Sequence, residues 1–289
     1  MKDNPRLGIL LMLVTMLVFA TQDGFSRLLA ERYNVMTVVL FRYWFFAAFV
    51  LILSASRKGG IARVAKSKRP GLQIFRGVLL VAEICVMVLG FVRLGLVEAH
   101  AIFATYPLIV AAMSGLVLSE PIGWRRRVAI ALGFVGVIVI LRPGFQVFSP
   151  DALIALAAAL MFALYALLTR MASRYDSAET SFFYTGVAGA VAITLVAPFW
   201  WDPMQTPADW GWMAALCVFG ASGHYLMIKA YEATEAATIQ PFAFFQLVFA
   251  SAIGIAFFSD ILQAWTVVGV VIIVAAGLFT LWRQRIKNV

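Results

Sequence analysis

Charged residues are scarce in this 289-residue chain. Asp, Glu, Lys and Arg make up only 13% of it, whereas 63% is hydrophobic. Soluble domains are about 25% charged and about 45–50% apolar. A soluble fold could not cover this much apolar surface with so few polar side chains, so the composition excludes an ordinary soluble protein. The lipid bilayer is the solvent that such a chain requires.

Cysteine is also scarce, and Cys85 and Cys217 both lie inside apolar runs, which argues against a disulfide or a metal pair. The sequence lacks GxSxG, HExxH, CxxC and P-loop patterns. We therefore expect neither an enzyme nor an ATP-driven pump, and no cofactor or metal. The net charge of +9 is interpreted as the loop bias of a membrane protein, because no basic stretch carries the interleaved aromatics of a nucleic-acid groove.

Apolar runs of about 20 residues, the length of one helical crossing of a bilayer, are abundant. The first run follows a basic lead like that of a signal peptide, but no small-residue cleavage site closes it, so we expect a retained span. Most linkers are short, which predicts a compact helical bundle without a soluble domain. The predicted spans are 8–29, 35–54, 72–92, 97–119, 126–142, 151–172, 179–200, 209–230, 236–258 and 264–282.

Basic residues divide unevenly between the two sides of the predicted bundle. With the N-terminus in the cytoplasm, 17 Lys and Arg residues fall on the cytoplasmic side and 4 on the opposite side. Because positive charge concentrates in cytoplasmic loops, both termini are predicted to face the cytoplasm, in a multi-pass protein of the inner cell membrane. Seven of the eight tryptophans fall at span ends, as in an aromatic belt, which supports the predicted boundaries.

The sequence repeats itself weakly. Residues 119–141 and 259–281 both start with Ser and an acid and then enter a Gly-containing span, and Glu98 and Glu235 mark the preceding spans. The same order of anchors predicts two halves, 1–146 and 147–289, with five spans each. Because five is odd, the second half enters the membrane from the opposite side, as in many secondary transporters. The predicted fold is an all-α integral membrane protein with ten transmembrane helices, arranged as two inverted five-helix repeats around a central cavity.

Three stretches carry a family resemblance: "FATQDGFSRLLAERY" (19–33), "LSEPIGWRRRVAIALGFVGVIVILRPG" (118–144) and "IQPFAFFQLVFASAIGIAFFSDILQAWTVVGVVIIVAAGLF" (239–279). The sequence resembles the drug/metabolite transporter superfamily, specifically its ten-span EamA-type members. Asp260 departs from the Glu that the family more often carries. The resemblance implies a basket-like bundle that exports or exchanges small metabolites without ATP. Aromatic and neutral amino-acid exporters are the members we compare first.

Glu83 is the most informative single residue, because it lies near the middle of an apolar span. A carboxylate at the centre of a bilayer costs about 2.5–3.5 kcal/mol on insertion scales, so it should face the bundle interior. It is a candidate for a proton or cation site, or for a ligand of a substrate ammonium. The alternative is a buried carboxyl group bonded to a neighbouring helix. Arg76 shares its helix face seven residues earlier and is expected to reach toward the cytoplasmic surface.

Two further acid–base candidates lie toward the outer side of the membrane. Asp23 and Arg42 lie at similar depth on adjacent spans and are interpreted as a structural ion pair, or alternatively as an outer gate. His100, one turn inside the fourth span, is either a titrating group at the mouth or a helix–helix hydrogen bond. Trp44 lies well inside its span and is a candidate for the cavity wall, although packing explains it as well.

Other polar or aromatic residues near the predicted midplane are candidates for the cavity, with helix packing as the alternative in each case. Two prolines inside spans, Pro107 and Pro241, predict helix kinks because each frees a backbone carbonyl. The remaining candidates for substrate contact are Tyr106, Tyr165, His224, Tyr225, Phe244 and Gln246.

The sequence therefore predicts a secondary-active or facilitative transporter of small metabolites, with amino-acid export by alternating access as the first expectation. The alternatives are an importer of a vitamin or nucleotide-like metabolite and, in a different class, a channel. The expected partners are a small-molecule substrate and the lipid bilayer, with a monomer as the functional unit. Glu83 or a histidine is a candidate for proton coupling, and transport down the substrate gradient alone is the other option.

Overall fold

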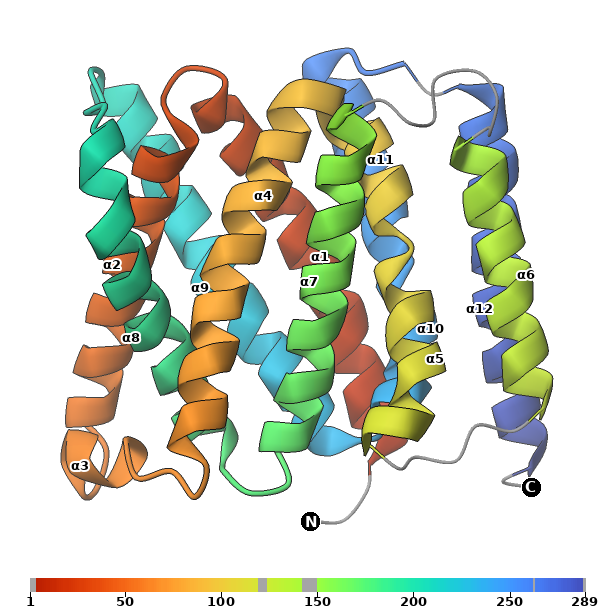
Figure 1. Cartoon of the computed structure of the whole chain (residues 1–289), viewed down its shortest axis with the longest axis horizontal. Helices are drawn as coiled ribbons and strands as arrows, with labels where there is room; N and C mark the ends of the chain where they lie inside the picture. The colour runs from red at the N-terminus through yellow and green to blue at the C-terminus, as the bar shows by residue number, and fades with distance from the viewer. Residues whose placement is uncertain (1–3, 119–123, 142–149, 262, 288–289) are drawn as a thin grey trace.

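The structure is a computed structural model that describes residues 4–118, 124–141, 150–261 and 263–287, and every regular element in these ranges is helical. Most of the helices stand side by side, and the start of α1 and the end of α12 lie at the same end of the bundle (Figure 1). The elements are α1 (Pro5–Ala30), α2 (Val35–Ala55), α3 (Gly60–Val64), α4 (Pro70–Phe103), α5 (Tyr106–Leu118), α6 (Trp124–Leu141), α7 (Pro150–Ala172), α8 (Ala178–Val196), the 3₁₀ helix η1 (Ala197–Trp200), α9 (Pro207–Ala233), α10 (Ala236–Ala243), α11 (Phe245–Phe258) and α12 (Ala264–Lys287).

Local sequence signals explain where several helices begin. The side chains of Asn4, Asn34 and Ser177 precede α1, α2 and α8 and accept hydrogen bonds from backbone N–H groups of the first turn. These caps satisfy donors that have no partner inside the helix. Pro70 and Pro207 occupy the first position of α4 and α9, where a missing N–H costs nothing.

Within the described residues, seven helical segments are long and apolar enough to cross a membrane, and Ala264–Ala276 is a shorter apolar segment. One of the seven, Pro70–Gly115, has 46 residues and contains both the third and the fourth predicted spans. Gly95 divides it, because its φ of 80° lies in a region that only glycine adopts readily. The seven long segments thus account for eight predicted crossings, and the shorter segment belongs to a ninth, α12. The helix α6, which begins with Trp124 and three arginines, is the remaining one of the ten crossings that the sequence predicts.

The helices of the two halves pair in a reciprocal pattern. The first span of each half packs on the third span of the other, as α1 packs on α9 and α7 on α4. The second spans, α2 and α8, pack on each other, and so do the fifth spans, α6 and α12, at one side of the bundle (Figure 1). A two-fold relation between inverted halves produces this exchange. The predicted boundary between residues 146 and 147 lies outside the described residues.

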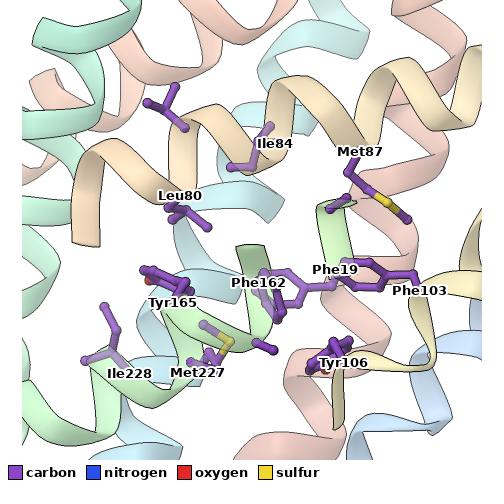
Figure 2. Packing of buried hydrophobic residues seen from close by; sticks show 14 of the residues in the cluster. Phe19, Leu80, Ile84, Met87, Phe103, Tyr106, Phe162, Tyr165, Met227 and Ile228 are labelled. Atoms are coloured by element: carbon purple, nitrogen blue, oxygen red, sulfur yellow. The ribbon is translucent and has the colours of Figure 1, made fainter. Parts of the chain in front are cut away.

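The outer surface carries many large apolar side chains, and the interior buries several polar and charged ones, as expected for a protein in a bilayer. Large apolar side chains such as Leu195 and Phe199 are mostly exposed, in the direction of the lipid. One large buried cluster fills the centre, where Phe19, Phe103 and Phe162 converge from three helices (Figure 2). Several charged side chains are buried beside this cluster, and they define the candidate site.

Candidate functional site

A cavity of about 40 Å³ lies between α1, α2, α4, α7, α9 and α11. One part of its wall is aromatic and consists of Phe19, Phe91, Phe103 and Phe162. The other part is polar and consists of Gln22, Asp23, Arg42, Glu83, His224 and Gln246. The cavity therefore combines charges of both signs with a set of phenyl rings, deep in the bundle.

Glu83 lies near the middle of the first part of α4, and its side chain is only 3% exposed. No hydrogen-bond partner of its carboxyl group is found among the described residues. A buried carboxyl group without a partner is costly, and it is commonly a functional site in a membrane protein. Its place on the cavity wall makes it available to a bound molecule.

Asp23 of α1 is the centre of a hydrogen-bond network. Its Oδ1 accepts from Gln22 Nε2 at 3.0 Å, and its Oδ2 accepts from Gln246 Nε2 of α11 at 3.0 Å. The same Oδ2 lies 3.0 Å from Nε2 of His100. Three helical segments of both halves are thus tied to one carboxylate.

Arg42 of α2 forms the second part of the network. Its guanidinium donates to Gln22 Oε1 at 2.7 Å and lies 3.3 Å from His224 Nε2. Gly220 makes this approach feasible, because a Cβ there would lie 3.0 Å from Arg42 Nε. The absence of a side chain on α9 leaves the room that the guanidinium occupies.

The ion pair expected between Asp23 and Arg42 is corrected by this geometry. The two groups share one cavity, but Gln22 stands between them and bonds to both. The ionisable partner of Asp23 within hydrogen-bond distance is His100, which is 2% exposed. His100 does not line the cavity itself, and its ring stacks on Phe91 at a centroid distance of 5.0 Å.

Five predicted cavity residues lie away from the cavity wall. Tyr106 and Phe244 are buried in apolar packing, and Tyr165 is fully buried with its hydroxyl group bonded to Arg76. Tyr225 packs on Phe182 and lines a small separate pocket beside α2 and α8. Trp44 is 42% exposed and donates to Thr194 Oγ1, so it faces outward. Depth along a span was predictable for these residues, but the face of the helix was not.

The two predicted kinks correspond to helix interruptions at matching places in the halves. Pro107 follows a break at residues 104–105, between α4 and α5. Pro241 precedes a break at Phe244, between α10 and α11. Each proline lacks the N–H group that would bond to a carbonyl of the preceding turn, so interruptions in the fourth and ninth crossings are expected on this ground.

Arg76 differs from the expectation that it reaches the cytoplasmic surface, because it is fully buried. Its guanidinium donates to Gln73 Oε1, Tyr165 Oη and Thr169 Oγ1. The same Gln73 donates to Asp176, in the loop before α8, at 3.0 Å. Uncharged acceptors thus bind the guanidinium of Arg76, and Gln73 connects it to the carboxylate of Asp176. In the same way, a glutamine connects Arg42 to an aspartate.

A cluster that the sequence did not predict ties α1 to the break in α4. Arg27 donates to both carboxylate oxygens of Asp260, at 2.7 and 2.8 Å. Asp260 also accepts the backbone N–H groups of Leu96 and Val97, the first residues after Gly95, and so caps the second part of α4. In the sequence, Asp260 stood out as an anchor of the repeat and as a departure from the family's more frequent Glu, but not as a helix cap or an ion-pair partner.

The volume of the cavity is small compared with that of a metabolite site. About 40 Å³ is room for one to a few water molecules, whereas pockets that hold metabolites measure about 300–1,000 Å³. The cavity as it stands is therefore too small for a metabolite, and entry of one requires the helices around the cavity to separate.

Ten helical crossings in two reciprocal halves around a buried, charged cavity define a polytopic membrane transporter. The chain belongs to the EamA-like transporter family, which it matches twice, over residues 6–142 and 150–282. It is a multi-pass membrane protein that carries small molecules, and it is not an enzyme.

Named relatives cover nearly the whole chain. The S-adenosylmethionine uptake transporter of Rickettsia prowazekii is 27% identical over 96% of this chain and 93% of its own length. The riboflavin transporter of Vibrio cholerae is 26% identical over 83% of this chain and 81% of its own length. The pseudopaline exporter CntI of Pseudomonas aeruginosa is 24% identical over 95% of each chain. A solved crystal structure has the same fold, with a TM-score of 0.73 at 14% identity over 93% of this chain and 95% of that one.

Proposed function

We propose that this chain carries a small metabolite that joins an amino-acid group to a ring, of the S-adenosylmethionine kind, across the inner membrane by alternating access. The observation that carries the proposal is the buried cavity in which Glu83, whose carboxyl group has no hydrogen-bond partner in the described part of the chain, faces the same space as Arg42. Two opposite charges in one site match the ammonium and the carboxylate of an amino-acid group.

Each part of such a substrate has a counterpart on the cavity wall. Glu83 binds the ammonium group, and the planar guanidinium of Arg42 binds the carboxylate group. Phe19, Phe103 and Phe162 receive the ring, and their faces also attract a sulfonium cation (Figure 2).

The relatives support a substrate of this size. They are named for uptake of S-adenosylmethionine, for riboflavin and for export of pseudopaline. This range includes both directions, so the direction of net transport follows the gradient in this proposal. The alternative importer of a vitamin or nucleotide-like metabolite, which the sequence analysis kept open, lies within the same range.

Export of an aromatic or neutral amino acid, the first expectation from the sequence, is the second candidate. The paired charges of Glu83 and Arg42 and the phenyl rings would serve it equally. A monomer holds all the residues of the proposed site, so a monomer is the proposed functional unit.

The test is flux into liposomes with the purified protein and a panel of labelled S-adenosylmethionine, riboflavin, phenylalanine and leucine. Saturable S-adenosylmethionine flux, inhibited by unlabelled S-adenosylmethionine, is the expected result. Saturable flux of phenylalanine or leucine alone would replace this substrate with an amino acid. Flux that rises without saturation for every compound would indicate a channel and contradict a transporter.

A matched pair of variants on α4 tests the site. Glu83→Gln keeps the shape and removes the charge, and we expect S-adenosylmethionine affinity to fall about 10- to 100-fold, the loss of one charge-assisted hydrogen bond. Glu98→Gln removes an exposed carboxylate from the same helix and should leave affinity unchanged. Equal affinity in both variants would remove Glu83 from the site.

A further inference from the structure

The contacts of His100 fix the number of protons that it shares with Asp23. Its Nδ1 lies 2.9 Å from the carbonyl oxygen of Leu96, and its Nε2 lies 3.0 Å from Oδ2 of Asp23. A neutral imidazole has one N–H group, so one of its nitrogen lone pairs would face an oxygen lone pair. Both contacts are favourable only when the pair holds one proton more than a neutral imidazole and a carboxylate.

The surroundings favour the imidazole as the place of that proton. Asp23 already accepts N–H groups from Gln22 and Gln246, an arrangement that suits an ionised, acceptor-only carboxylate. The ring of His100 is stacked on Phe91 with an interplanar angle of 10°. A phenyl face attracts a cation, so this contact also favours the imidazolium.

We propose that the Asp23–His100 pair is a proton-binding site, and that its proton leaves when a cationic substrate enters the central cavity. This proposal rests on the proposed function for its substrate. In the step, the Nε2–H bond of His100 breaks, the electron pair stays on Nε2 and the proton passes to water. Asp23, whose side chain lines the cavity, then accepts a hydrogen bond from the ammonium group of the substrate.

Charge balance explains why the two events are linked. With Glu83 ionised, Asp23 and Glu83 carry two negative charges, and Arg42 and the His100 imidazolium carry two positive charges. S-adenosylmethionine, with a sulfonium, an ammonium and a carboxylate, brings one net positive charge. Release of one proton restores neutrality in a site where an unbalanced charge is expensive.

The link between substrate binding and proton release needs no charged group beyond those that surround the Asp23–His100 pair. Among the described residues, α7 and α11 face the pair with the uncharged Phe162 and Gln246. The groups that face the pair are Glu83 on α4, Arg42 on α2, His224 on α9, Tyr106 on α5 and, beyond Leu96, Asp260 with Arg27.

The first experiment reads the proton without substrate. The chain has two histidines, so ¹⁵N-histidine NMR of His224→Gln reports on His100 alone. At neutral pH we expect both ring nitrogens of His100 to be protonated, and we expect a neutral ring when Asp23→Asn is added. A neutral ring in both proteins would overturn the proposal, whatever the substrate is.

The second experiment measures proton release by the full-length protein in a weakly buffered solution with a pH indicator. Addition of S-adenosylmethionine should release about one proton per bound molecule, and affinity should rise about tenfold per pH unit where the pair titrates. His100→Gln should bind without proton release and with a flat pH profile. Binding without release by the wild-type protein would contradict the proton site and leave the proposed function intact.

The two proposals fail separately. If S-adenosylmethionine does not bind, the proposed substrate is wrong, and the NMR result still decides whether the Asp23–His100 pair holds a proton. If Asp23→Asn does not fold, a neutral His100 ring, with a proton on one nitrogen only, in His224→Gln is sufficient to overturn the proton site.

Discussion

At the scale of the residue, the site depends on the absence of a side chain at Gly220. Gly220 of α9 faces the relay in which Gln22 bonds to both Arg42 and Asp23. A Cβ at residue 220 would lie 3.0 Å from Arg42 Nε and 3.1 Å from Gln22 Oε1. The relay would have to shift to admit a methyl group, and Arg42 would lose its position relative to the cavity.

Gly220→Ala should therefore lower substrate affinity about tenfold, the equivalent of one weakened hydrogen bond to a charged group. Gly211→Ala on the same helix is the control, because no atom lies within 4 Å of a Cβ at that position. It should retain affinity and gain up to about 1 kcal/mol of helix stability. Binding titrations and unfolding curves of the two variants make the comparison, and equal affinities would show that the relay tolerates the methyl group.

Asp176, in the loop between α7 and α8, offers a second residue-scale prediction. Burial opposes ionisation of its carboxyl group, but hydrogen bonds from Ser67, Gln73 and the Lys68 N–H, with the Lys68 charge, outweigh burial and lower its pKa. A lowered pKa in the folded state contributes stability above the unfolded-state pKa. This contribution is lost as the pH falls through the folded value, below about pH 4.

We expect Asp176→Asn to flatten the acid side of the stability profile of the protein. Its unfolding temperature should change less between neutral pH and about pH 3 than that of the wild type. Glu179→Gln removes a partly exposed acid that contacts Arg57 and Arg63 in the same region and should keep most of the wild-type slope. Identical slopes for Asp176→Asn and the wild type would contradict the role of these hydrogen bonds.

At the scale of the element, the break in α4 shows what sequence can and cannot predict. Hydropathy predicts both crossings, 72–92 and 97–119, because each needs about 20 apolar residues. It does not predict that α4 runs from the third crossing into the fourth with a single non-helical residue, Gly95, between them. The cap on the second crossing comes from Asp260, 164 residues away from Leu96, and no local pattern indicates such a partner.

Asp260→Asn tests this cap and its ion pair. The substitution removes the charge opposite Arg27, both side chains being 12% exposed, and we expect a loss of about 2–4 kcal/mol of stability. Glu31→Gln removes the other, more exposed acid bonded to Arg27 and should cost less than about 0.5 kcal/mol. Unfolding in a mild detergent measures both, and equal losses would mean that Asp260 has no special role.

The candidate site could be predicted in part for the same physical reason. Exposing a polar side chain to lipid is expensive, so the depth of Glu83, Asp23 and Gln246 in their spans predicts that these side chains face the bundle interior. All three line the cavity. Aromatic residues carry no such penalty on either face, and Trp44 points outward whereas Phe162 points inward. Gln22, next to Asp23, connects two charges, and only the packing of α1 against α2 and α9 reveals it.

At the scale of the whole molecule, interactions outside the cavity hold both ends of the bundle together. At one end, Arg27 and Asp260 join α1 to the α11–α12 connection, and Arg32 bonds to Asp209. At the other end, Asp176 bonds the loop before α4 to the loop before α8. The alternating access that we propose requires the two sets to open in turn.

Which of these ends faces the cytoplasm follows, in our proposal, from the distribution of basic residues. Two exposed positions at opposite ends test it: Lys58 between α2 and α3, and Ala208 at the start of α9. Each is replaced by cysteine in a chain whose Cys85 and Cys217 are changed to alanine, and intact cells are treated with a membrane-impermeant maleimide. We expect Ala208→Cys to react in intact cells and Lys58→Cys only after permeabilisation, because 17 of the Lys and Arg residues, Lys58 among them, fall on the side predicted to be cytoplasmic. The reverse pattern would place both termini outside. The Arg27–Asp260 cluster would then lie on the inner side of the membrane and the Asp176 cluster on the outer side.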